Sequence, residues 1–159
     1  MDLIQVLEQR KTAVINQAAN TLMRAQLPHY GQVSMEQNKE KLQSLYDHMV
    51  QCIKDRNLET MIKYAEEMAS ERFGAGFDLY EVQKEFNVLE EALWFQIIRD
   101  CGPSQLARAL GIISTVHGVG KDTLARKYVS LASKTKSPSL DLQVLFKGTD
   151  DLYIRNRSC

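Results

Sequence analysis

The chain has 159 residues, enough for one domain with a real core, since chains of this size bury roughly 68–70% of the surface that they expose when unfolded. Its 20 basic and 20 acidic residues give a net charge of zero, so no overall field draws it to nucleic acid or to an anionic membrane. The sequence shows neither a signal peptide nor a run of about 18 apolar residues. We therefore expect a cytoplasmic protein that binds neither nucleic acid nor membrane.

The three cysteines, Cys52, Cys101 and Cys159, are odd in number and far apart along the chain. This spacing fits neither a disulfide framework nor a CxxC metal or redox motif, and it favours a reducing compartment. Cys52 falls within an apolar helical stripe, where a buried thiol behaves as a small hydrophobic side chain. We expect it to fill the core.

The first two predicted helices are separated by a proline. Apolar residues recur at steps of three and four over residues 3–26, which predicts one amphipathic helix that Pro28 ends. Ser34 and Gln37 then have the spacing of a capping box, in which each side chain accepts a hydrogen bond from an otherwise free amide. A second helix is expected to follow from there.

The next two helices are predicted from their caps and their glycines. Asn57 is a plausible N-cap for a third helix, which should end near Arg72 before a glycine-containing turn. Asp78 and Glu81 repeat the capping-box spacing and open a fourth helix. Gly102 and Pro103 should close that helix.

A fifth helix is expected after Ser104, which can cap it. Gly118 and Gly120 each cost about 1 kcal/mol relative to alanine in a helix interior, so we predict a kink or break there. Asp122 can then cap a continuation that runs to Leu131.

The last part of the chain, residues 135–159, is predicted to be a tail beyond a helical domain of residues 1–134. Residues 140–146 alternate partly between apolar and polar side chains, and residues 147–151 resemble a turn. A short hairpin and a flexible tail are both open alternatives.

One stretch around Gly120 and Lys121 could be mistaken for a phosphate-binding loop. Such a loop needs a glycine five residues before its Gly-Lys pair and a serine or threonine after the lysine. Those positions hold Thr115 and Asp122. An aspartate there would repel phosphate, so a nucleotide site is disfavoured and a kinked helix is expected.

The histidines indicate no metal centre, because none has a glutamate three residues before it, as the Glu-x-x-His pairs of di-metal bundles do. His117 nevertheless lies on the same predicted stripe as Leu110 and Ile113, and an inward histidine in an apolar pocket could bind haem or another small ligand. The alternative is a hydrogen-bonded core histidine. No nucleophile elbow or catalytic triad is visible, so we expect no enzyme and no cofactor.

Trp94 and Phe95 are adjacent and must point in different directions from one helix, which leaves one of them available to a partner. The last predicted helix offers a second contact surface through Leu124, Tyr128 and Leu131. These five residues are the candidate interface.

Residues 68–82 read MASERFGAGFDLYEV and are followed by Phe86, Leu89 and Trp94. This stretch resembles the N-terminal helical domain of RsbT co-antagonist (RsbR-type, stressosome) proteins, and the similarity extends over residues 3–134. The resemblance implies a globin-like bundle without haem that dimerises, passes a signal through its last helix and performs no catalysis. The chain departs from that pattern after residue 134, where the residues that follow are too few for the usual output domain. Two alternatives stay open: the chain is part of a longer protein, or it acts alone by binding partners.

The sequence therefore predicts an all-α, globin-like bundle of about five to six helices. Its expected function is that of a non-enzymatic regulatory domain, which senses or docks as a homodimer in bacterial stress or signal regulation, with a regulatory protein as a second kind of partner. The alternative is a small-ligand carrier, haem included, that uses a pocket near His117.

Overall fold

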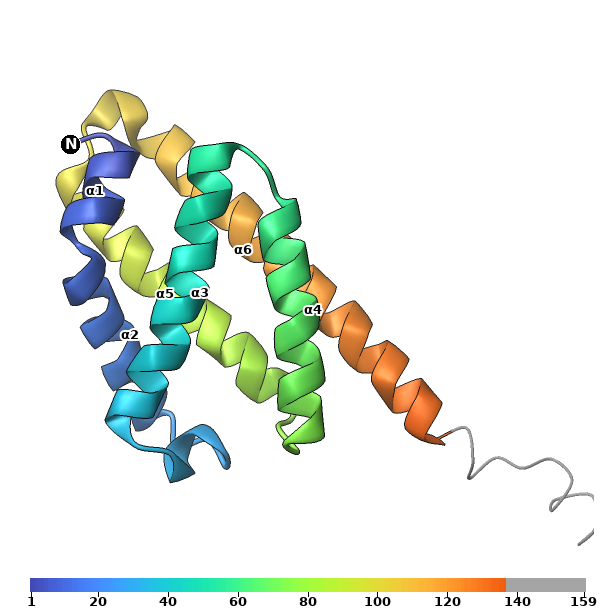
Figure 1. Cartoon of the computed structure of the whole chain (residues 1–159). Coiled ribbons are helices and arrows are strands. Elements are labelled where there is room, and N and C mark those ends of the chain that lie inside the picture. The colour runs from blue at the N-terminus through green and yellow to red at the C-terminus, as the bar shows by residue number, and fades with distance from the viewer. Residues whose placement is uncertain (137–159) are drawn as a thin grey trace, which may run out of the picture. The chain divides into compact units, whose positions relative to one another are not determined.

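The computed structural model describes residues 1–136. Within these residues the regular secondary structure is entirely helical (Figure 1). The helices are α1 (Leu3–Gln9), α2 (Lys11–Arg24), the short 3-10 helix η1 (Tyr30–Gln32), α3 (Met35–Asp55), α4 (Glu59–Gly74), α5 (Leu79–Asp100) and α6 (Pro103–Lys136). This confirms the predicted all-α fold with five to six α-helices. The predicted hairpin or flexible tail falls on residues 137–159, outside the described residues.

Residues Met1–Tyr128 form one compact unit, and a second unit begins at Val129. In the first unit α2 lies against both α5 and α3, and α3 lies against α4 (Figure 1). All six α-helices contribute to one continuous apolar core, to which the buried Cys52 belongs as predicted. The eight described residues of the second unit continue α6 to its end.

The beginning of the chain is attached to the end of α5. The N-terminal ammonium of Met1 donates to the Asp100 carbonyl at 2.9 Å, and Arg10 Nε donates to the Asp100 carboxylate at 2.7 Å. Arg10 separates α1 from α2, so the prediction of one helix over residues 3–26 was wrong. The bend lets both segments bury apolar side chains while Arg10 reaches Asp100.

Three of the predicted helix starts use the expected side chains. One is the capping box of Asp78 and Glu81, in which the Asp78 amide donates to Glu81 Oε2 at 3.0 Å. Ser34 and Gln37 form both hydrogen bonds of their capping box, each at 3.1 Å. Asn57 Oδ1 accepts from the Glu59 amide at 2.9 Å, although Leu58 occupies the N-cap position itself.

The predicted break in the last helix, with a new cap at Asp122, was wrong. α6 is continuous from Pro103 to Lys136, so Asp122 lies in its interior rather than at a cap. Pro103 occupies the first helical position, where a missing amide hydrogen costs nothing, and this places Ser104 inside the first turn.

Gly120 marks a close approach of α6 to its neighbours rather than a helix end. A Cβ atom there would lie 2.5 Å from Phe86 Cε1 and 3.1 Å from Met61 Sδ. Gly118 has open space around its Cα atom. The two glycines therefore have different roles, although both lie within the same helix.

Candidate functional site

The outer side of α5 carries exposed apolar side chains. Trp94, Phe95 and Ile98 are 41%, 54% and 58% exposed, respectively. Their spacing of one, three and four residues places them on one side of the helix, with the exposed Glu91 and Arg99 at its ends. We call these five residues the α5 outer face. The sequence predicted one available aromatic side chain here, and both are exposed.

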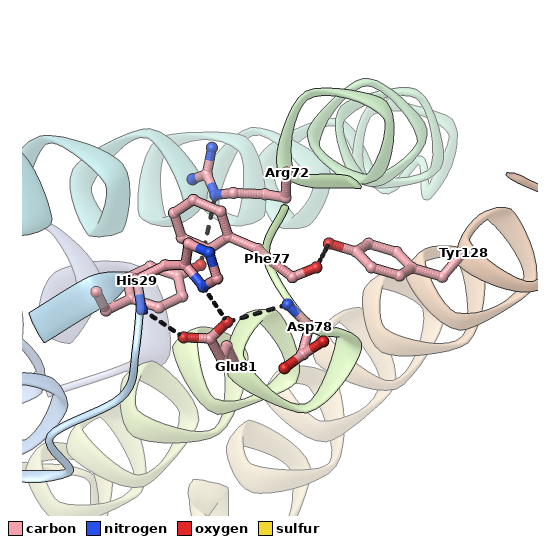
Figure 2. A network of polar contacts seen from close by, with 7 residues as sticks. His29, Arg72, Phe77, Asp78, Glu81 and Tyr128 are labelled. Atoms are coloured by element: carbon pink, nitrogen blue, oxygen red, sulfur yellow. Dashed lines mark hydrogen bonds and ion pairs between the residues drawn. The ribbon is translucent and has the colours of Figure 1, made fainter. Parts of the chain in front are cut away.

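The interface prediction needs a correction on α6. Leu124 is fully buried in the core and Tyr128 is also buried, so neither side chain can contribute to an outer contact surface. The Tyr128 hydroxyl donates to the Phe77 carbonyl at 3.0 Å (Figure 2), which connects α6 to the turn between α4 and α5. Leu131, in the second unit, is half-buried.

The charges of the α5 outer face are arranged symmetrically about Phe95. Glu91 lies four residues before Phe95 and Arg99 four residues after it, one helical turn away on either side. The Arg99 side chain is 66% exposed, and its Nε is 3.9 Å from the Asp100 carboxylate, a long contact. This leaves the guanidinium free to meet another acid.

A buried polar cluster joins Tyr30, Arg72 and Glu85 inside the bundle. The Tyr30 hydroxyl donates to Glu85 Oε2, Arg72 Nη2 lies 3.5 Å from the same oxygen, and Arg72 Nε donates to the Tyr30 hydroxyl at 3.4 Å. Burial raises the pKa of Glu85, while the positive charge of Arg72 opposes that rise. Because all three groups are buried, the cluster holds helices together rather than meeting a substrate.

A second polar group fixes the loop before η1 to the start of α5 (Figure 2). The buried Glu81 carboxylate accepts hydrogen bonds from the His29 amide at 2.8 Å and the Asp78 amide at 3.0 Å, and His29 Nδ1 lies 2.7 Å from it. The His29 ring stacks on Phe77 with 4.7 Å between ring centres. Burial alone would raise the pKa of Glu81, but these hydrogen bonds hold its pKa below the usual value.

This geometry predicts an acid-sensitive contribution of Glu81 to stability. A carboxylate whose pKa is lowered by folding stabilises the protein above its unfolded pKa of about 4.3, and that stability is lost as the pH falls through the folded pKa. Glu81→Gln should lower the free energy of unfolding at neutral pH by about 1–3 kcal/mol, and the loss should shrink under acid. Urea unfolding at pH 7 and pH 3 measures it, with the exposed Glu66→Gln as control; equal losses at both pH values would contradict the account.

His117 is fully buried, and its ring has one free nitrogen. Nδ1 lies 2.9 Å from the Ile113 carbonyl, and because a carbonyl only accepts, Nδ1 carries the hydrogen. Burial lowers the pKa of His117, so the ring is neutral and Nε2 presents a lone pair. Nε2 has no hydrogen-bond partner within the described chain.

A cavity of about 910 Å³ lies among the start of α1, the end of α3, the turn between α3 and α4, and the first half of α6. Leu110, Ile113 and His117, the predicted pocket residues, do not line it. Ile112, Thr115 and Val116 of the same helix do. The predicted pocket residues therefore lie on α6, the helix that forms one wall of the cavity, but on a different side of that helix.

No family model, curated protein or solved structure matches the chain. Over residues 1–136, no helix combines the length and the apolar character that a membrane span requires.

Proposed function

We propose that the chain is a non-enzymatic regulatory domain that docks to a second copy of itself through the α5 outer face. The observation that carries this proposal is the exposure of Trp94, Phe95 and Ile98 on one side of a single helix. Side chains of this kind are the usual anchors of protein interfaces. Covering them in a complex removes apolar area from water, which favours association.

The charge order of the face supports a second copy as the partner. A twofold interface must be self-complementary, since each residue meets its counterpart across the axis. If two α5 helices cross antiparallel with Phe95 at the axis, Glu91 of one copy faces Arg99 of the other, twice. The net charge of zero adds no overall repulsion between two copies.

The resemblance to RsbT co-antagonist domains supports the regulatory part of the proposal, because it implies a helical dimer without catalysis. It also favours a role in bacterial stress or signal regulation. A dimer that forms through α5 would leave other surfaces of the bundle available to a regulatory partner protein.

Truncating the centre of the face should weaken the dimer. Phe95→Ala is expected to raise the dimer dissociation constant about thirtyfold, because central aromatic anchors contribute about 2 kcal/mol. Tyr80→Ala is the matched control, since Tyr80 is also exposed on α5 but lies about 22 Å away along the helix axis. Analytical ultracentrifugation over a concentration series measures both variants. Equal dissociation constants for Phe95→Ala and the wild type would overturn the proposal.

Binding of a small ligand at His117 is the second candidate function. The unpartnered Nε2 lone pair is the feature that a haem iron or a hydrogen-bond donor would need. Haem titration tests it through the Soret absorbance of the protein and of a His117→Phe variant. A spectrum that is the same for both proteins would exclude His117 as the ligand.

A further inference from the structure

The 910 Å³ cavity has the size and the lining of a ligand site, because small-molecule pockets typically enclose about 300–1,000 Å³ and are mostly apolar. Its floor consists of buried or half-buried side chains, which include Leu3, Cys52, Ile53, Ile112 and Val116. A hydrocarbon chain placed there would leave water for an apolar surface. Each methylene that it buries should tighten binding about fourfold.

Two arginines stand at the exposed rim of this cavity. Arg56 ends α3 and Arg108 lies on the second turn of α6, and both line the cavity. Neither forms an ion pair with a carboxylate of residues 1–136. A guanidinium group is suited to bind a carboxylate through two parallel hydrogen bonds.

One acidic residue, Asp2, also lines the cavity. Its Oδ1 accepts a hydrogen bond from the Gln5 amide at 2.9 Å, so this carboxylate is engaged in capping α1. The cavity lining therefore has two arginine side chains without an ion pair among residues 1–136, and one carboxylate that is already engaged in a helix cap. The charge balance at the rim favours a negative head group.

We propose that this cavity binds a single-chain anionic amphiphile, with its carboxylate held by Arg56 and Arg108 and its alkyl chain on the apolar floor. The site is separate from His117 and from the α5 outer face. Binding there contacts α1, α3 and α6 together, so it would also stabilise the fold.

Dodecanoate below its micellar concentration is the probe, with dodecyltrimethylammonium as a control of equal chain length and opposite charge. Isothermal titration calorimetry of the full chain should give one dodecanoate per chain, bound at least tenfold more tightly than the cation. The double variant Arg56→Gln/Arg108→Gln should lose that preference. Equal affinity of the wild type for both probes, or no binding of dodecanoate, would overturn the proposal.

A pair of glycines on α6 provides a test that does not depend on removing charge. Gly111 lines the cavity and Gly118 does not, and a Cβ atom added at either meets open space. Leucine favours a helix over glycine, so both substitutions should leave the protein folded. Gly111→Leu should weaken dodecanoate binding at least tenfold by occupying the cavity, whereas Gly118→Leu should not change it. Equal binding by the two variants would place the ligand elsewhere.

Discussion

Replacing Arg72 with methionine is expected to lower the free energy of unfolding by about 3–5 kcal/mol, because it leaves the buried Glu85 carboxylate without its counter-charge. The Glu85 side chain is fully buried, and its Oε1 already has no hydrogen-bond partner within the described residues. Among residues 1–136, only the Tyr30 hydroxyl would continue to donate to this carboxylate. Chemical denaturation at neutral pH measures the loss.

The pH dependence and a second variant separate an unpaired charge from a packing defect. Without Arg72, burial should raise the pKa of Glu85 further above its unfolded value, and a carboxyl group of this kind stabilises the fold more as the pH falls. The deficit of Arg72→Met should therefore be smaller at pH 5 than at pH 8. Arg72→Met/Glu85→Met should recover most of the lost stability, since an apolar pair can replace a buried ion pair. A double variant as unstable as Arg72→Met would show that the ion pair is not the cause.

Gly120→Ala and Gly118→Ala are expected to change stability in opposite directions. An alanine Cβ at position 120 would lie 2.5 Å from a ring carbon of Phe86. The side chains or the helix would have to shift to make room, which typically lowers the free energy of unfolding by about 1–3 kcal/mol. At position 118 the added methyl meets open space, so the higher helix propensity of alanine should stabilise the protein by up to about 1 kcal/mol. Thermal unfolding of both variants measures the contrast. Stabilisation by both substitutions would show that α6 does not need this close approach.

The helical pattern of the sequence was sufficient to predict the fold class, because apolar periodicity and caps are local signals. Ser34 and Gln37 identified a helix start from four residues of sequence alone. The break at Arg10 has a non-local cause, since Arg10 pairs with Asp100, 90 residues away. The same holds for Gly120, whose role depends on Phe86 from another helix.

The candidate sites were predictable only in part. The exposed aromatic side chains of α5 were identified, and Ile98 could have been added because it lies three and four residues beyond them. The buried carboxylates also left a signal: Glu81 and Glu85 fall on the apolar side of α5 next to Val82 and Phe86. The cavity left none, because three helices far apart in the sequence, α1, α3 and α6, form it together with the turn between α3 and α4.

We propose that two copies meet antiparallel across Phe95, and a charge-reversal cycle tests this interface most directly. Sedimentation equilibrium would compare the wild type, Glu91→Arg, Arg99→Glu and the double variant that carries both changes. Each single reversal places like charges opposite each other twice across the axis, so both should weaken the dimer, and the double variant should restore an affinity close to that of the wild type. A wild type that is monomeric at tens of micromolar would contradict the proposed interface. So would a double variant whose loss of dimerisation free energy equals the sum of the losses of the two single variants.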